Sequence, residues 1–146
     1  MALQVVVFSL GREDYGIPID DVQEITRLEK IYPLPQAPLE IQGLIRIRGQ
    51  AIPLINLNKK FAVQQVKEPE YAIIIEVKDR LVAFAVEEVK EVKTFEAVAP
   101  PPMLVNSNLI RGLINLPEGI IILLEPQGIL NEEEMTNLGD WLDKVR

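Results

Sequence analysis

The chain has 146 residues, a formal net charge of −7 and 48% apolar residues, which is ordinary for one globular domain. Cysteine and histidine are both absent, which excludes disulfides, zinc sites built on those residues, thiol nucleophiles and imidazole bases. The acidic charge disfavours nucleic acid as the main partner, and no signal peptide or membrane-length apolar run is present, so a cytoplasmic protein without membrane insertion is expected.

Strand patterns begin near the N-terminus. Residues 5–10 (VVVFSL) and 15–19 (YGIPI) are apolar runs separated by the polar stretch GRED, which is typical of strand, tight turn and strand. The segment 20–25 (DDVQEI) follows. Residues 31–38 (IYPLPQAP) are predicted as an ordered loop, because proline cannot donate a hydrogen bond to a sheet.

A second pair of strand patterns follows this loop, at 41–47 (IQGLIRI) and 51–57 (AIPLINL). Gly49 between them predicts a tight hairpin turn that leaves Arg48 at its edge. Pro53 predicts that the second of these strands lies at a sheet edge or contains a bulge.

The second half of the chain repeats the order of the first. The matching segments are 5–10 with 72–77, 15–19 with 82–86, 20–25 with 87–92, 31–38 with 98–103, and 41–47 with 110–116. These matches predict an internal duplication with units of approximately 4–61 and 71–130, and exchange of strands between the units is compatible with it. The alternative is chance similarity between short apolar strands. Four or five short strands per unit indicate a barrel or sandwich, and two small units sharing an apolar seam would stabilise each other.

The C-terminal segment 131–146 differs from the rest, because its apolar residues recur with the period of a helix. Asn131 is a suitable N-cap, and three glutamates after it complement the positive end of a helix dipole. The residues predicted to form the apolar face are Met135, Leu138, Leu142 and Val145. A helix docked on the β-structure is therefore expected.

A cationic segment, residues 41–67, contains two arginines and three lysines but no acid. The position equivalent to Arg48 in the second unit is Pro117, so the turn itself does not require arginine. This asymmetry favours a binding role for Arg48, whose guanidinium can pair with carboxylates at an interface. The alternative is that Arg46 and Arg48 are ordinary solvated residues and that Gly49 serves only the turn.

Three stretches carry a family resemblance: FSLGREDYGIPIDDVQEI (8–25), IQGLIRIRGQAIPLINLNKKF (41–61) and IRGLINLPEGIIILL (110–124). Together they resemble the CheW family, whose members are adaptors that couple chemoreceptors to the histidine kinase CheA. The resemblance covers residues 4–135 and beyond, so the chain is expected to be a single CheW-like domain spanning 1–146.

The resemblance implies an all-β fold with a C-terminal helix: two tandem small five-stranded SH3-like β-barrels packed on a shared apolar seam. It also implies no catalysis and no cofactor or metal. The implied partners are the regulatory domain of CheA and the cytoplasmic tip of chemoreceptors. A protein that is a monomer in isolation and is recruited to membrane-associated receptor arrays is expected.

Site residues carry over from the family motifs. The implied partner-facing positions are Val22, Glu24, Ile25, Gly43, Arg46, Arg48, Gly49 and Ala51. Arg46 departs from the common family pattern Asn-Leu-Arg-Gly. A second kinase contact is expected in the second proline loop, at Pro100, Pro102, Met103 and Leu104.

Other functions remain open from the residues alone. The chain could be the CheW-like regulatory module of a larger kinase or of a CheV-type adaptor, although its start at Met1 and its own closing helix favour a separate protein. A nucleic-acid-binding barrel is supported only by the cationic segment 41–67. A carboxylate-based hydrolase would need two acids facing each other, and no spacing in the sequence requires that.

Overall fold

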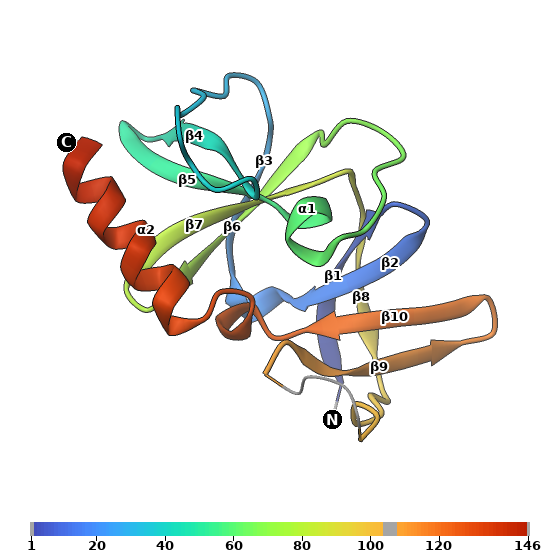
Figure 1. Cartoon of the computed structure of the whole chain (residues 1–146). Coiled ribbons are helices and arrows are strands. Elements are labelled where there is room, and N and C mark those ends of the chain that lie inside the picture. Colours follow the sequence, from blue (N-terminus) through green and yellow to red (C-terminus); the bar gives the residue numbers. More distant parts are fainter. Residues whose placement is uncertain (1, 104–107, 146) are drawn as a thin grey trace.

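The computed structural model describes residues 2–103 and 108–145, which form two sheets and a C-terminal helix (Figure 1). The strands are β1 (Leu3–Leu10), β2 (Glu13–Pro18), β3 (Val22–Arg27), β4 (Ile41–Ile47), β5 (Gln50–Asn56), β6 (Tyr71–Val77), β7 (Arg80–Val86), β8 (Glu88–Phe95), β9 (Ile110–Leu116) and β10 (Gly119–Leu124). The helices are α1 (Leu57–Phe61) and α2 (Glu132–Val145), with 3-10 turns η1 (Ile19–Asp21) and η2 (Pro126–Gly128). Neither α-helix, within the described residues, is long and apolar enough to span a bilayer.

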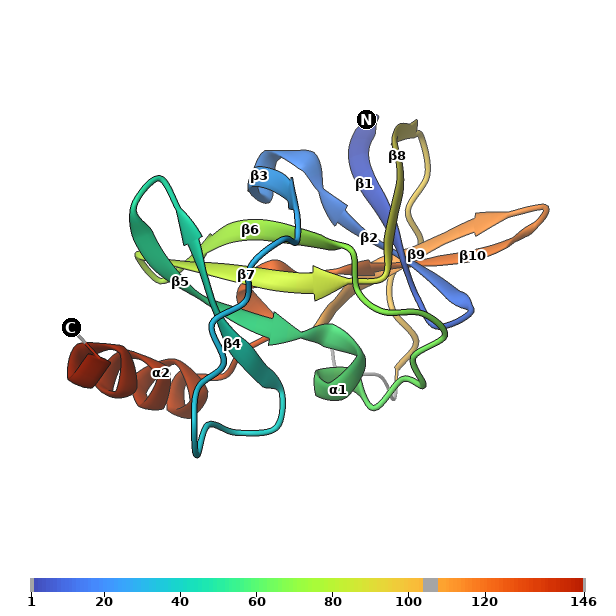
Figure 2. The ribbon, with the colours of Figure 1, turned by 90° about the horizontal axis from the view of Figure 1, so that it is seen from above.

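Each sheet takes strands from both halves of the chain. The first sheet has the order β8-β1-β2-β10-β9, and the second has the order β3-β6-β7-β5-β4. Adding or subtracting five converts each strand number of one sheet into that of the other, so the two sheets have equivalent topologies. The predicted all-β fold with two five-stranded units and a C-terminal helix is confirmed, whereas the exact bounds of the duplicated units stay a prediction. Figure 2 shows α2 and the β9–β10 hairpin at opposite ends of the molecule.

The central strands of each sheet are buried on both faces, which explains their unbroken apolar runs. In β1, Val6 and Phe8 belong to a cluster shared by the two sheets, whereas Val5 and Val7 belong to a cluster within the first sheet. Strand β6 repeats this alternation in the second sheet. Burying one such side chain contributes about 1.5–3 kcal/mol. The shared cluster is therefore the apolar seam between the two units.

Each proline-bearing loop makes one bridge to the strand that follows it. Tyr32 exchanges two backbone hydrogen bonds with Leu44 on β4, at 2.8 and 2.9 Å. Ala99 makes the equivalent pair with Leu113 on β9, also at 2.8 and 2.9 Å. Both loops are thus ordered at this point, as expected, and the equivalence of the two halves extends to them.

The prediction that Pro53 marks an edge strand or bulge is wrong, because β5 is an inner strand between β7 and β4. The β4–β5 register is regular at Pro53, which lies opposite Leu44. The parallel pairing of β5 with β7 starts only at Leu54. Proline is therefore tolerated because it stands just before the ladder to β7 begins.

A buried carboxylate, that of Glu87, joins three separate segments. Its side chain accepts hydrogen bonds from the Gly11 backbone N–H, from Asn58 Nδ2 at 2.6 Å, and from the backbone N–H groups of Val66 and Lys67 at 3.1 and 3.0 Å. Burial by itself opposes ionisation and would raise the pKa of Glu87, but these hydrogen bonds together outweigh it and lower the pKa. Glu87 is thus an ionised core residue that fixes the β1–β2 turn, α1 and the loop after α1.

Helix α2 begins with the predicted cap. The Glu134 backbone N–H donates to Asn131 Oδ1 at 2.7 Å, and the Asn131 N–H donates to Glu134 Oε1 at 3.0 Å. This reciprocal pair is a capping box. The Lys60 ammonium also pairs with Glu134, and the buried Met135 and Leu138 join the shared cluster. The predicted N-cap and the docking of the helix are therefore observed.

Replacing Asn131 with alanine should lower the free energy of unfolding by about 1 kcal/mol, because the Glu134 backbone N–H loses its side-chain acceptor. The control is Asn137→Ala, which makes the same substitution at an exposed position inside α2. Alanine has the higher helix propensity there, so Asn137→Ala should be neutral or slightly stabilising. Urea denaturation followed by far-UV circular dichroism checks both variants. Equal effects at the two positions would contradict the capping role.

Candidate partner-binding surface

The turn between β4 and β5 consists of Arg48 and Gly49. Both residues have positive φ, 50° and 80°, and they close the pair Ile47–Gln50. Two consecutive residues of positive φ form the type I′ turn that suits the twist of a hairpin. A Cβ on Gly49 would meet no atom within 4 Å, so the turn projects into open space. The predicted tight hairpin with Arg48 at its edge is thus observed.

Arg48 forms an ion pair with Glu24 on β3. Arg48 Nη2 lies 3.0 Å from Glu24 Oε1, and the two side chains are 81% and 30% exposed. Strands β3 and β4 are the two ends of the second sheet, so the pair connects opposite ends of a curled sheet. An ion pair this exposed contributes at most about 1 kcal/mol. Its main consequence is to present a guanidinium and a carboxylate side by side on the surface.

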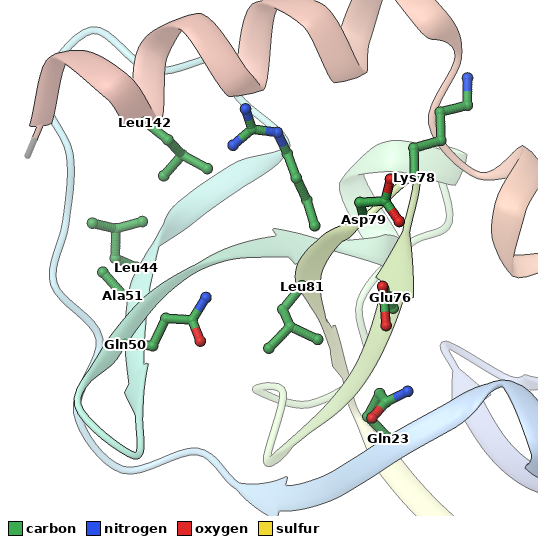
Figure 3. Close-up of a pocket in the computed structure, with 10 residues that line it drawn as sticks. Gln23, Leu44, Gln50, Ala51, Glu76, Lys78, Asp79, Leu81 and Leu142 are labelled. Atoms are coloured by element: carbon green, nitrogen blue, oxygen red, sulfur yellow. The ribbon is translucent and has the colours of Figure 1, made fainter.

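A hollow of about 770 Å³ lies between the β4–β5 hairpin, the β6–β7 turn and α2. Ala51 and Leu44 of the hairpin, Gln23 of β3 and Leu142 of α2 are among its lining residues (Figure 3). Gln23 precedes Glu24 in the chain, and Ala51 is exposed. Of the predicted positions, Ala51 thus lines the hollow, whereas Arg48 and Gly49 form the turn of the same hairpin and Glu24 is joined to that turn by the ion pair.

Two neighbours of Glu24 on β3 differ in burial. Ile25 is 36% exposed, whereas Val22 is partly buried and packs against the shared apolar cluster. Val22 thus supports the position of β3, and Ile25 offers exposed apolar area on the same strand as Glu24.

Gly43 and Arg46 lie apart from this surface. Gly43 is buried, with a φ of 151°, and a Cβ there would lie closer than 3.0 Å to the Tyr32 carbonyl oxygen. Its evident role is to let the first proline loop approach β4, and a direct partner contact stays a prediction. Arg46 is exposed and lines a separate, smaller cavity next to Tyr32.

The predicted second kinase contact follows β8, which belongs to the first sheet. Pro100 and Pro102 are exposed there, and Met103 is 100% exposed. Leu104 lies outside the described residues. These positions are remote in topology from the Glu24–Arg48 pair, so the predicted residues form two separate groups.

Sequence reasoning missed some residues of the hollow. Leu142 is predicted only as part of the apolar face of a helix, and Gln50 is not among the predicted partner-facing residues. A signal for Gln23 was available, because it stands inside the VQEI segment whose other members were singled out. The sequence contains no signal that places Leu142 in the hollow, because it does not specify against which surface α2 docks.

Comparison with known proteins decides the family. A family model described as the CheW-like domain matches residues 4–134. The chain belongs to the CheW-like domain family. A chemotaxis protein CheW from Klebsiella aerogenes is 33% identical, over 90% of this chain and 84% of that relative. A chemotaxis protein CheW from Treponema pallidum is 28% identical, over 94% of this chain and 87% of that relative.

A solved CheW structure has the same architecture as this CheW-like domain. The crystal structure of the scaffolding protein TtCheW from Thermoanaerobacter tengcongensis matches with a TM-score of 0.83 and 30% identity, covering 92% of this chain and 98% of that one. The predicted family is therefore confirmed, and the match extends over nearly the whole fold of a scaffolding protein.

Proposed function

We propose that this chain is a non-enzymatic adaptor that couples chemoreceptors to the histidine kinase CheA in the cytoplasm. Membership of the CheW-like family supports this role, as do relatives named chemotaxis proteins and a structural neighbour described as a scaffolding protein. The proposed partners are the cytoplasmic tip of a chemoreceptor and the regulatory domain of CheA. The isolated chain is expected to be a monomer.

The observation that carries the proposal is the exposed Glu24–Arg48 pair at the tip of the β4–β5 hairpin. It contributes little to stability, yet it presents two opposite charges, and the strand and hairpin that carry them also carry the exposed Ile25 and Ala51. Such a surface suits helices that present both charges and apolar side chains. We assign it to the receptor. The exposed second proline loop, including Met103, is assigned to the kinase.

Replacing Arg48 with alanine should leave the unfolding midpoint nearly unchanged, because only an exposed ion pair is lost. The same variant should weaken binding to a receptor signalling fragment about tenfold, since a guanidinium at an interface contributes roughly 1–3 kcal/mol. Co-sedimentation with the receptor fragment and a CheA regulatory domain measures this binding.

The matched control is Arg12→Ala, which removes an exposed arginine from the β1–β2 turn of the other sheet. It should bind both partners like the unmodified chain. Unchanged receptor binding by a folded Arg48→Ala variant would count against the assigned surface. Binding of neither partner by the unmodified chain would count against the adaptor role itself.

A further inference from the structure

A small cavity separates the two ends of the second sheet. It has a volume of about 160 Å³ and lies between the end of β3 and the middle of β4. Leu28, Ile45 and Ile47 supply its apolar lining and also pack in or against the cluster inside this sheet. A cavity of roughly this size accommodates a group as large as benzene. It can therefore take one aliphatic side chain.

At this cavity, the outer edge of β4 carries one residue, Arg46, whose backbone N–H and C=O groups have no backbone partner among the described residues. Residues two apart along a strand direct their N–H and C=O groups to the same side. Leu44 uses that side to pair with Tyr32, so Arg46 directs its backbone N–H and C=O along the same edge. Within the described residues, no loop or strand continues the pairing beyond the Tyr32–Leu44 bridge to Arg46. The edge can thus accept an additional strand.

Three cations surround the same opening, although the chain as a whole has a net charge of −7. Arg27 lies over the Tyr71 ring at 5.4 Å, and Lys30 lies over the Tyr32 ring at 5.3 Å. None of Arg27, Lys30 and Arg46 belongs to an ion pair formed among the described residues. Three cations thus face one carboxylate, that of Glu29, among the residues that line the opening.

We propose that the β3–β4 opening binds an extended acidic peptide segment as an added strand on β4. The backbone of Arg46 continues the ladder that Tyr32 and Leu44 begin. One aliphatic side chain of the peptide enters the cavity, and its carboxylates meet Arg27, Lys30 and Arg46. Adding a strand to an exposed edge is a general mode of peptide recognition. This site is lined by residues other than Glu24 and Arg48, and it does not depend on the adaptor role.

A peptide fits this opening better than a nucleic acid does. Single-stranded nucleic acids need aromatic faces on which bases can stack. Here each nearby tyrosine ring already has a cation over it, and Glu29 lies among the lining residues. The backbone N–H and C=O of Arg46 at the strand edge can form hydrogen bonds with the C=O and N–H of a second peptide backbone. Charge and backbone geometry together favour an acidic peptide.

Binding to the intact chain can be tested with a blocked peptide of about eight residues in which glutamate alternates with valine. Its glutamine counterpart and oligouridylate serve as the other probes. We expect the glutamate peptide to bind more tightly than either. Binding should weaken with salt, since the contacts are between exposed charges. Arg46→Ala should weaken binding about three- to fivefold, as expected for one exposed ion pair, and Arg12→Ala should not.

Amide hydrogen exchange tests the added strand separately from charge attraction. The glutamate peptide should slow exchange of the Arg46 N–H, and this protection should be absent with oligouridylate. Peptide binding without protection of Arg46 would overturn the strand-addition geometry. Four outcomes would overturn the site itself. Three of them are failure of the glutamate peptide to bind, equal binding of the glutamine peptide, and tighter binding of oligouridylate than of the glutamate peptide. The fourth is that Arg46→Ala and Arg12→Ala weaken binding equally.

Discussion

Replacing Glu87 with glutamine is expected to lower the free energy of unfolding by about 3 kcal/mol at neutral pH. The two carboxylate oxygens of Glu87 accept four hydrogen bonds, and three of the donors are backbone N–H groups, of Gly11, Val66 and Lys67. Glutamine has a single carbonyl oxygen, and its NH₂ group would face donors instead of accepting from them. Buried donors would then lack partners, which costs about 1–3 kcal/mol each.

The matched control is Glu88→Gln, which removes the same charge from the next residue, where the side chain is exposed. Surface substitutions of this kind usually change stability by about 0.5 kcal/mol or less. Urea denaturation of the two variants gives the comparison directly. Similar stabilities for Glu87→Gln and Glu88→Gln would refute the assignment of Glu87 as a structural carboxylate.

The lowered pKa of Glu87 also predicts how the stability of the fold depends on pH. A carboxyl group whose folded-state pKa is depressed contributes stability that is fully present above its unfolded value of about 4.3, and this stability is lost as the pH falls through the folded-state pKa. Protonated Glu87 resembles glutamine. The stability difference between the unmodified chain and Glu87→Gln should therefore narrow below about pH 4. A constant difference from pH 7 to pH 3 would contradict this.

Glu87 illustrates what the sequence could not predict. The apolar runs of β1 and β6 were recognised as strands because their pattern is local. The donors to Glu87 come from residues separated from it by 76, 29, 21 and 20 positions. In the sequence, Glu87 is one acid among 22, and its neighbour Glu88 is exposed. Only the packing of three segments distinguishes the two residues.

The same limit applies to the surface residues. Arg48 could be selected because its turn and its counterpart Pro117 are both readable in the sequence. Its pairing with Glu24 could not be predicted, since it depends on the curl that brings β3 close to β4. Likewise, Arg27 and Arg46 are 19 positions apart in the chain, and only this curl places them around one cavity.

Replacing Gly43 with alanine is expected to lower the free energy of unfolding by about 3 kcal/mol or more. The φ of 151° disfavours any side chain, at about 1–2 kcal/mol. The added methyl group would also displace the Tyr32 carbonyl oxygen, and the two hydrogen bonds between Tyr32 and Leu44 contribute about 1 kcal/mol each. Chemical denaturation measures the total.

Alanine substitutions at two other glycines measure the backbone cost and the steric cost separately. Gly119 has a φ of 156° but no atom within 4 Å of an added Cβ, so Gly119→Ala should cost only the backbone term of about 1–2 kcal/mol. Gly112 has no positive φ, but its Cβ would lie 2.6 Å from the Ala99 carbonyl oxygen in the equivalent loop. Gly112→Ala should therefore show the clash alone. Additivity of these two costs at Gly43 would support the equivalence of the two halves.

The three glycine variants also help to interpret any loss of partner binding by a Gly43→Ala variant. Because Gly43 is buried beneath the first proline loop, a Gly43→Ala variant that fails to bind a partner should already have lost stability or the local Tyr32–Leu44 bridge. Arg48→Ala, in contrast, should lose binding with its stability intact. Denaturation, binding and amide exchange at Leu44, measured on both variants, distinguish the two mechanisms. A Gly43→Ala variant with unmodified stability, a protected Leu44 amide and no partner binding would instead make Gly43 a direct contact.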